Sequence, residues 1–181
     1  MRLSRIVSDL LDLSRLETGS DLLERVRLDV IATDEVERLG DRAEEAGITI
    51  QLHADAVPSV AGSGRDLALL VRNLIDNAVR YTPSGGRVDV SVSAVDGQIV
   101  LQVVDTGMGI PQRHLPRVFE RFYRVDRARS RETGGTGLGL AIVRHVAENH
   151  GGEVTVRSEL SAGSTFVVRL PVGGAARADA P

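Results

Sequence analysis

Residues 65–104, RDLALLVRNLIDNAVRYTPSGGRVDVSVSAVDGQIVLQVV, contain the patterns that establish the class of fold. Residues 65–81 place apolar side chains every three or four positions, which predicts an amphipathic helix. Residues 87–95 then alternate between valine and polar or small residues, and residues 98–104 form the return strand, so two half-buried strands follow the helix. Asp96-Gly97 between the two strands is the strongest short signal for a hairpin turn.

Other segments continue the same mixture of helices and hairpins along the chain. Short patterns predict a strand over 26–28, a helix over 29–46 closed by Gly47, a strand over 48–52, a helix over 137–149 stopped by Gly151-Gly152 and a hairpin of 154–157 with 164–170. The fold class is therefore α+β. We expect a two-layer α/β sandwich, with a mixed sheet covered on one face by about three helices.

An additional helix is predicted at the N-terminus. Leu3, Ile6, Leu10 and Leu13 repeat at spacings of three and four, and the pattern ends near residues 17–19. Two heptads are too few to establish a coiled coil. A seam that pairs with another helix and a helix that packs on its own domain therefore both remain open.

Composition limits what the protein can be. The 181 residues suffice for one domain with short appendages, and a net charge of -3 argues against a nucleic-acid binder. The absence of cysteine excludes disulfides, thiolate nucleophiles and cysteine metal ligands. No apolar run is long enough to span a membrane, and residues 1–16 mix arginine and aspartate unlike a secretory signal. We expect a cytoplasmic chain.

Polar residues lie beside the apolar stripe of the helix over 65–81. Asn73 and Asn77 are one turn apart, and Arg80 falls on the same flank. An asparagine oxygen can complete the coordination of a magnesium ion already held by phosphates, and arginine suits phosphate oxygens. Taken alone, these residues fit a solvated helix edge better than a binding site.

A glycine-rich turn follows the strand over 98–104. It reads Asp105-Thr-Gly107-Met-Gly109. An aspartate at a strand end can accept a hydrogen bond from an exocyclic amine, and glycines let the backbone approach a ligand closely. The alternative is a tight turn that uses glycine for its positive φ.

Residues 105–136 have no periodicity, and an irregular segment of this length in a compact domain is usually functional. Three of the five Phe and Tyr rings lie in residues 119–123, surrounded by arginines. A basic lid with an aromatic hinge over a phosphate site fits this pattern, and a solvated loop with no role fits almost as well. Gly134–Leu140 then opens a helix, where bare N–H groups suit phosphate. It is neither a Walker loop nor a dinucleotide fingerprint, and a flexible hinge is the alternative.

Together and in this order, the four motifs resemble the N, G1, F and G2 boxes of histidine kinases, a likeness that spans about residues 26–171. The boxes read Asn73-Leu-Ile-Asp-Asn77-Ala78, Asp105-Thr-Gly107-Met-Gly109, Phe119-Glu-Arg-Phe122 and Gly135-Thr-Gly137-Leu-Gly139. The resemblance implies a Bergerat-type ATP-binding fold, shared with gyrase, heat-shock chaperone and mismatch-repair ATPases. It also implies phosphoryl transfer from ATP to a histidine nitrogen, with catalysis by positioning and charge neutralisation.

The resemblance assigns roles to individual residues. Asn77 would bind magnesium directly with Asn73 beside it, Asp105 would bind the adenine amine, and Phe119 with Phe122 would position a lid over the triphosphate. Asn73, Asn77 and Arg80 are the implied catalytic residues. The implied nucleotide-binding residues are Asn77, Arg80, Tyr81, Asp105, Gly107, Gly109, Ile110, Phe122, Arg124, Gly135, Thr136, Gly137, Leu138, Gly139 and Leu140.

Residues 4–17 resemble the second helix of the family's dimerisation hairpin. The implied organisation is a helix remnant over 1–18, a linker over 19–25, a catalytic domain over 26–172 and a disordered tail over 173–181. The phosphoacceptor motif is absent, because none of the four histidines is followed by an acid: His53, His114, His145 and His150. We expect ATP and Mg²⁺ binding without autophosphorylation of this chain.

The expected partners are ATP, a dimerisation domain with the phosphoacceptor histidine and the receiver domain of a response regulator, but no nucleic acid. The longer protein is expected to be a homodimeric membrane sensor. A gyrase-type ATPase is one alternative, but it would carry a glutamate base where Asn73 stands. An anti-sigma-factor serine kinase is opposed by the N-terminal helix, and a degenerate scaffold is opposed by the intact boxes.

Overall fold

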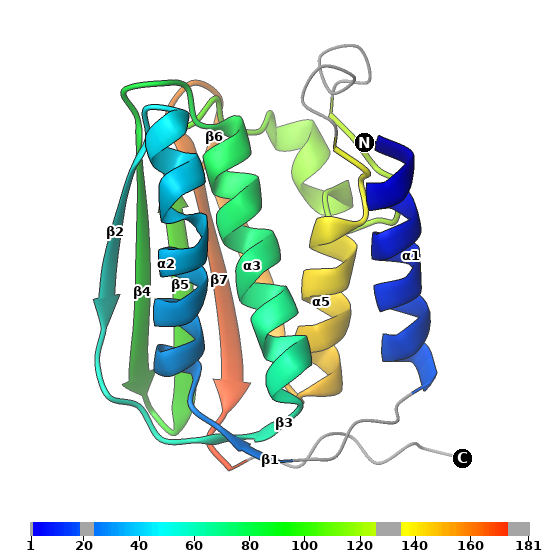
Figure 1. Cartoon of the computed structure of the whole chain (residues 1–181), viewed down its shortest axis with the longest axis vertical. Helices are drawn as coiled ribbons and strands as arrows, with labels where there is room; N and C mark the ends of the chain where they lie inside the picture. Colours follow the sequence, from blue (N-terminus) through cyan, green and yellow to red (C-terminus); the bar gives the residue numbers. More distant parts are fainter. Residues whose placement is uncertain (1, 19–23, 126–134, 174–181) are drawn as a thin grey trace.

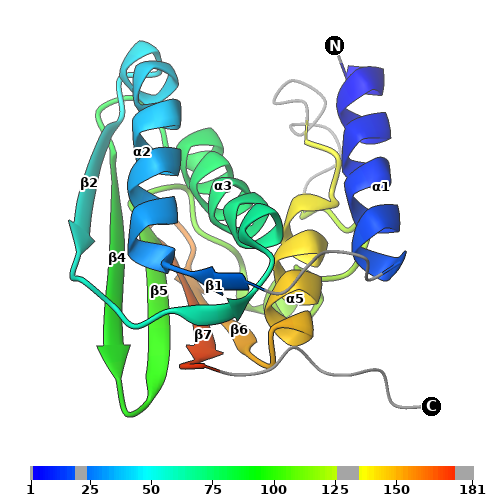
Figure 2. The ribbon, with the colours of Figure 1, turned by 60° about the horizontal axis from the view of Figure 1, so that its bottom comes forward.

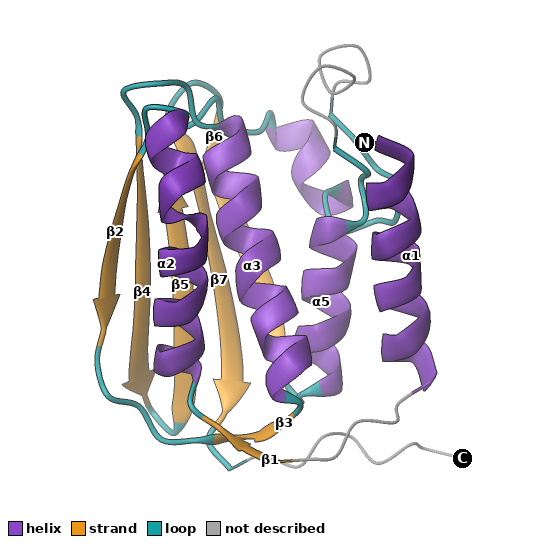
Figure 3. Ribbon diagram, viewed as in Figure 1, coloured by secondary structure: helices purple, strands orange, loops and turns teal. Residues whose placement is uncertain are grey.

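The computed structural model describes residues 2–18, 24–125 and 135–173. Three helices, α2 (Leu28–Glu45), α3 (Gly64–Tyr81) and α5 (Gly139–Asn149), cover one face of a five-stranded sheet (Figures 1 and 3). A further helix, α1 (Arg2–Thr18), lies alongside α5. This arrangement confirms the predicted two-layer α+β sandwich with about three helices on the sheet.

The main sheet is mixed, and its strand order is β2-β4-β5-β7-β6. Its strands are β2 (Thr49–Ala54), β4 (Arg87–Val95), β5 (Gln98–Asp105), β6 (Glu153–Glu159) and β7 (Gly163–Pro171). β2 and β4 are parallel, as a crossover through α3 requires, and the other pairs are antiparallel. A small antiparallel pair, β1 (Glu24–Val26) with β3 (Val60–Gly62), lies across the N-terminal ends of α2 and α3 (Figure 2).

The core lies between the sheet and the helices. Val88, Val90 and Val92 of β4 are buried on the helix side, as their alternation predicts. Their neighbours on β5 and β7 continue the apolar layer, which receives Leu67, Leu70 and Leu74 from α3. The opposite face of β4 carries Asp89, Ser91 and Ser93, so the helices cover only one face of the sheet.

A histidine joins the start of α3 to the end of α5. Ser63 caps α3 through its side chain, which accepts a hydrogen bond from the Asp66 N–H at 3.2 Å. The Ser63 N–H in turn donates to His150 Nε2 at 3.1 Å. Since Nε2 accepts, the proton of the ring lies on Nδ1, which donates to the Val146 carbonyl at 2.7 Å. The buried imidazole therefore fixes the two helices that flank the cavity described below.

Glycines end two of the helices, as predicted. Gly47 follows α2 with a φ of 70°, and Gly151 follows α5 with a φ of 71°. At each end the residue after the glycine donates its N–H to a carbonyl five positions back, Ile48 to Ala43 and Gly152 to Ala147. These are Schellman caps, which satisfy carbonyl groups that the helix itself leaves unpaired.

Three short elements differ from the sequence-based expectation. The strand expected over 26–28 ends at Val26, and the buried Leu28 already begins α2. β3 was not anticipated, because three residues are too few to show alternation. The segment expected to be irregular contains a 3-10 helix, η1 (Gln112–Arg117), which follows Pro111 and has no apolar periodicity to reveal it.

The N-terminal helix packs on its own domain with one part of its apolar surface, whereas its pairing with another helix stays a prediction. Leu13 and Leu16 are buried in the core cluster, so α1 packs on its own domain. Val7, Leu10 and Leu11 are between 41% and 54% exposed, so part of its apolar surface stays uncovered. The side chains of Leu3 and Ile6 lie outside the described residues, as do residues 19–23 and 174–181 of the expected linker and tail. Within the described ranges, no helix is long and apolar enough to cross a membrane.

Candidate functional site

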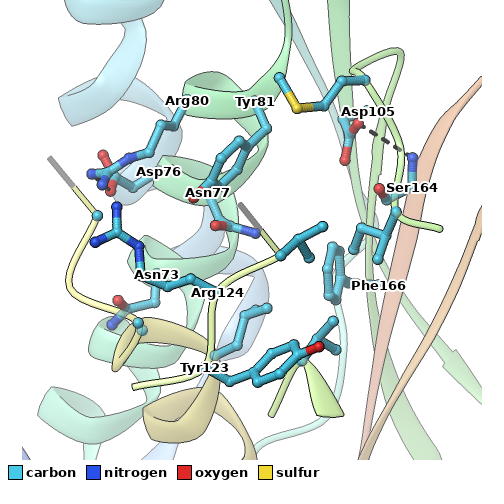
Figure 4. Close-up of a pocket in the computed structure, with 18 of the residues that line it drawn as sticks. Asn73, Asp76, Asn77, Arg80, Tyr81, Asp105, Tyr123, Arg124, Ser164 and Phe166 are labelled. Atoms are coloured by element: carbon cyan, nitrogen blue, oxygen red, sulfur yellow. Dashed lines mark hydrogen bonds and ion pairs between the residues drawn. The ribbon is translucent and has the colours of Figure 1, made fainter. Parts of the chain in front are cut away.

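A cavity of about 290 Å³ lies where the C-terminal end of α3, the end of β5 and the N-terminal end of α5 meet (Figure 4). Its walls are Asp9; Asn73, Asp76, Asn77, Arg80 and Tyr81; Asp105, Met108, Gly109, Ile110 and Pro111; Val118, Tyr123, Arg124 and Val125; Gly135, Thr136, Gly137, Gly139 and Leu140; and Leu160, Ser164 and Phe166. Segments far apart in sequence thus share one site.

One wall is the polar flank of α3. Burial of the apolar stripe of this helix leaves Asn73, Asn77 and Arg80 on the side that faces the cavity. The Asn73 amide donates from Nδ2 to the Leu69 carbonyl at 2.8 Å, so its Oδ1 is the atom turned toward α5. Figure 4 shows Asn77 pointing into the cavity from one turn further along. Two amide side chains therefore line this wall.

A buried carboxylate forms the opposite end. Asp105 is the last residue of β5 and is only 5% exposed. Its Oδ1 accepts hydrogen bonds from the Gly107 N–H at 2.8 Å and from the Ser164 N–H at 3.2 Å. Burial raises the pKa of Asp105 above its ordinary value, although these two N–H groups act in the opposite direction. Both hydrogen bonds fall on Oδ1, and the carboxylate lines the cavity.

The β6–β7 hairpin supports the loop after Asp105. The Ser161 N–H donates to the Met108 carbonyl at 2.8 Å. Gly109 has a φ of 66°, and a Cβ there would lie 1.9 Å from the Glu159 carbonyl oxygen. A residue with a side chain would therefore force the hairpin and the loop apart. Leu160, at the tip of the hairpin, lines the cavity.

The aromatic segment forms the side of the cavity beyond η1. Phe119 packs edge-on against Phe166, with ring centroids 6.5 Å apart. The hydroxyl of Tyr123 is 2.6 Å from His114 Nδ1, and the Arg117 guanidinium lies 4.3 Å from the centre of the Tyr123 ring. Tyr123 is thus held from two sides where it lines the cavity. Phe122 instead points outward, with 58% of its surface exposed.

The glycine-rich segment closes the site against the other walls. A Cβ on Gly135 would lie 3.4 Å from the Tyr81 hydroxyl and 3.5 Å from Arg80 Nη1. A Cβ on Gly139 would lie 2.8 Å from Asn73 Oδ1. Thr136 donates from Oγ1 to Asp9 Oδ2 of α1 at 2.6 Å. The segment therefore touches both the α3 wall and the N-terminal helix.

Most of the residues expected at the site do line this cavity. They are Asn73, Asn77, Arg80, Tyr81, Asp105, Gly109, Ile110, Arg124, Gly135, Thr136, Gly137, Gly139 and Leu140. Gly107 lies behind Asp105 against the Tyr81 carbonyl, and Leu138 is fully buried in the core. Phe122 reaches the site only through its backbone, because its N–H donates to the Gly137 carbonyl at 2.8 Å. Arg127, Arg129 and Arg131 lie outside the described residues.

Sequence reasoning missed several wall residues. Asp76 lies inside the Asn73–Asn77 motif, so its position beside Asn77 could have indicated that it lines the same site. Ser164 and Phe166 look like ordinary strand residues, and only the pairing of β7 with β5 brings them to Asp105. Asp9 gave no signal, since its place depends on how α1 packs. The other wall residues not assigned to the site from sequence are Met108, Pro111, Val118, Tyr123, Val125 and Leu160.

The donors present suit a divalent cation that arrives with phosphates. Among the described residues, no three His, Cys, Asp or Glu side chains gather to hold a metal ion by themselves. Magnesium commonly binds through only one or two protein oxygens and completes its shell with phosphate and water. The Asn73 and Asn77 amides fit such an incomplete shell, and Arg80 and Arg124 add positive charge beside them.

A family model described as "Histidine kinase-, DNA gyrase B-, and HSP90-like ATPase" matches residues 62–174. The chain belongs to this family. Within it, the chain corresponds to the catalytic ATP-binding domain of sensor histidine kinases, as its relatives show.

The sensor-like histidine kinase SenX3 of Mycolicibacterium smegmatis is 42% identical over 172 residues, which are 94% of this chain and 45% of that protein. The mycobacterial sensor histidine kinase MprB has a solved structure with a TM-score of 0.73 and 31% identity, covering 85% of this chain and 100% of that one. The structure of full-length ShkA in complex with AMPPNP has a TM-score of 0.80 and 32% identity to this chain. The match covers 96% of this chain and 36% of ShkA. The chain thus spans less than half of SenX3.

Proposed function

We propose that this chain binds Mg-ATP in the cavity and transfers the γ-phosphoryl group to a histidine on a dimerisation domain of the same protein. The phosphoryl group would then pass to an aspartate in the receiver domain of a response regulator. The observation that carries this proposal is the meeting of the α3 amides, the Asp105 carboxylate and the glycine-rich segment around one cavity. ShkA, the relative in complex with AMPPNP, supports the same ligand class.

Adenine is assigned to the end of the cavity near Asp105. Oδ2 of this carboxylate would accept from the exocyclic amine, while the N–H groups of Gly107 and Ser164 hold Oδ1. Gly109 and Ile110 let the backbone pass close to the base and add an apolar edge. An acceptor that is fixed before the base arrives selects an amine over a carbonyl at this position.

The phosphates are assigned to the end between α3 and α5. Asn77 would bind magnesium directly with Asn73 beside it, and Arg80, Tyr81 and Arg124 would contact phosphate and ribose. When bound, the magnesium ion would neutralise charge on the phosphate oxygens. The start of α5 lines the same space, and the N–H groups at the N-terminus of a helix favour an anion. The remaining residues assigned to this end are Gly135, Thr136, Gly137, Leu138, Gly139 and Leu140.

The aromatic segment and the glycine-rich segment are joined beside the cavity, where the Phe122 N–H donates to the Gly137 carbonyl at 2.8 Å. A Cβ on Gly137 would lie 2.9 Å from the Phe122 carbonyl carbon, so these backbones touch. We assign Phe119 and Phe122 to positioning: Phe119 anchors the segment on Phe166, and Phe122 holds the glycine-rich end through its backbone.

The transfer step needs few protein groups. A histidine imidazole nitrogen forms the new bond to the γ-phosphorus while the bond to the β,γ-bridging oxygen breaks, and ADP carries away the electron pair. The protein positions the two reactants and neutralises charge, and a neutral amide at Asn73 cannot take a proton from water. Hydrolysis should therefore be slow. Within this chain, His150 has both ring nitrogens occupied, which disfavours it as the acceptor.

The longer protein is proposed to be a homodimeric membrane sensor. Residues 1–18 would be the second helix of its dimerisation hairpin, 19–25 the linker, 26–172 the catalytic domain and 173–181 a tail. The exposed Val7, Leu10 and Leu11 of α1 support this division, because they leave an apolar stripe for a partner helix. The domain itself would then lie in the cytoplasm.

Titration with a fluorescent ATP analogue, with and without magnesium, tests the proposal. Asn77→Ala should remove the magnesium dependence, and Asp105→Asn should abolish binding. Asn149→Ala, at the far end of α5, is the matched control and should bind like the parent chain. A folded parent chain that binds no nucleotide would refute the proposal.

A second assay tests the reaction. A separately supplied dimerisation domain with its histidine should become labelled from γ-labelled ATP. Asn73→Glu supplies the carboxylate that a hydrolase needs, and it should raise the steady-state ATPase rate above that of the parent. Rapid release of phosphate by the parent itself would instead favour a gyrase-type ATPase.

A further inference from the structure

One wall residue does not fit a simple site for a polyanion. Asp76 lies between Asn73 and Asn77 in the sequence and lines the cavity. A bare carboxylate beside a phosphate chain would weaken binding by repulsion. Its side chain is 13% exposed, so water screens it only in part. A role for Asp76 must therefore offset this unfavourable charge.

The contacts of Asp76 show what the carboxylate does. Its Oδ2 accepts a hydrogen bond from Arg80 Nη2 at 2.7 Å, one turn further along α3. Its Oδ1 accepts from Nη1 of Arg42, which reaches across from α2. The carboxylate thus joins two guanidinium groups from two helices, and the three side chains together carry one positive charge.

Of the three linked side chains, Arg42, Asp76 and Arg80, the Arg80 guanidinium is the one that faces the glycine-rich segment. Its side chain is only 8% exposed. While Nη2 is bound to Asp76, Nη1 lies 3.5 Å from the position of a Cβ on Gly135, close to the Tyr81 hydroxyl. One end of the guanidinium is therefore held by the carboxylate, and the other is presented toward the proposed phosphate end of the cavity.

Arg42 does not itself line the cavity. It lies on α2 with 49% of its side chain exposed, behind Asp76 as seen from the cavity. A single i,i+4 pair on a helix is weak, because it must order two flexible side chains. A second guanidinium on the same carboxylate fixes Asp76 before Arg80 binds to it, so less freedom remains to be lost.

We propose that Asp76 and Arg42 are positioning residues that hold the Arg80 guanidinium at the glycine-rich segment, ready for the phosphate chain of the nucleotide. This inference rests on the proposed function of the cavity. It assigns no contact with ATP to Asp76 or Arg42; both act through Arg80.

The sign of one substitution separates positioning from simple electrostatics. Asp76→Asn removes a negative charge near the phosphates, so electrostatics alone predicts tighter binding of ATP. Loss of the grip on Arg80 predicts weaker binding. We expect the second effect to dominate, with Mg-ATP affinity falling about tenfold, which corresponds to about 1.4 kcal/mol.

Calorimetric titration of the whole chain with Mg-ATP measures binding at both ends of the cavity, and a separate titration with adenosine measures binding without the phosphates. Arg42→Gln should weaken Mg-ATP binding in the same direction, and the double variant should be no weaker than Asp76→Asn alone, because both changes break one chain of contacts. Asp76→Glu keeps the carboxylate and should restore part of the affinity. Adenosine, which has no phosphates, should bind all variants like the parent.

Asp89→Asn is the matched control, since Asp89 is also paired with an arginine, Arg87, but on the open face of the sheet. It should leave both titrations unchanged. Mg-ATP binding that is unchanged or tighter in Asp76→Asn and in Arg42→Gln would overturn the inference while leaving the proposed function intact. A folded parent chain that binds neither ligand would overturn both. Arg42→Gln, on another helix and half exposed, keeps the test decisive if Asp76→Asn does not fold.

Discussion

Substitution of Gly109 by alanine tests how tightly the loop after Asp105 is bound to the β6–β7 hairpin. Two penalties add at this position. A residue with a Cβ in the left-handed region costs about 1–2 kcal/mol, and Gly109 has a φ of 66°. The new methyl group would also lie 1.9 Å from the Glu159 carbonyl oxygen and 3.0 Å from the Leu160 Cα, so backbone must move. Overpacking of this kind costs about 1–3 kcal/mol.

We therefore expect Gly109→Ala to lower the free energy of unfolding by about 2–5 kcal/mol. Two other glycines separate the contributions. Gly97 has a φ of 74° but nothing within 4 Å of its Cβ position, so Gly97→Ala should cost only the conformational part, about 1–2 kcal/mol. Gly40 lies within α2 with open space around it, and Gly40→Ala should stabilise by about 0.5–1 kcal/mol.

Urea unfolding followed by circular dichroism gives the three differences. At an m-value of about 2 kcal/mol/M, Gly109→Ala should lower the midpoint by about 1–2.5 M without changing the slope. The difference between Gly109→Ala and Gly97→Ala isolates the steric part. If these two variants unfold within about 0.5 kcal/mol of each other, the close approach of loop and hairpin is not real and the reasoning fails.

Three further substitutions follow from the same geometry. Since burial raises the pKa of Asp105, the folded chain binds this proton more tightly than the unfolded chain, and stability falls as pH rises from the ordinary to the raised pKa. Asp105→Asn should thus be at least as stable as the parent at neutral pH, and unfolding measured at lower pH should show this advantage disappear. The variant should nevertheless fail to bind ATP, because the Asn NH₂ group replaces the acceptor. The new Cβ of Gly135→Ala would make only ordinary van der Waals contacts, so the midpoint of urea unfolding should stay unchanged. Nucleotide titration should show weaker binding, because the methyl group lies beside Arg80. An affinity equal to that of the parent would contradict the assignment of the phosphates to this end. Ser63→Ala removes the cap of α3 and should cost about 1 kcal/mol in urea unfolding, whereas Ser93→Ala, on the open face of β4, should cost almost nothing.

Local patterns were sufficient for most of the secondary structure. The apolar spacing of α3, the valine alternation of β4 and the glycines after α2 and α5 each act over a few residues, and the structure has all of them where expected. Asp96 and Gly97 both have positive φ, as the predicted hairpin turn requires. The strand β3 and the helix η1 were missed, and the first strand was placed too late in the sequence, because these short elements depend on contacts distant in sequence rather than on a local pattern.

The cavity was predictable in part for the same reason. Asn73 and Asn77 share one flank because a helix repeats every 3.6 residues, and Asp105 stands at the end of a strand that alternation reveals. Ser164 could not be found in this way, since its N–H meets Asp105 only through the register of β7 against β5. The outward orientation of Phe122 likewise follows from a backbone conformation with a φ of 62°, which no sequence pattern announced.

The class of fold, the four motifs and the chemical types of the groups around the cavity could be predicted from the amino-acid sequence, because periodicity and residue chemistry are local properties. Which of these groups meet depends on the tertiary structure. The contact of Asp9 with Thr136 and the bridge from Arg42 through Asp76 to Arg80 join residues of different helices. Such contacts depend on how helices pack across the sheet, which is set by the shape of the whole core.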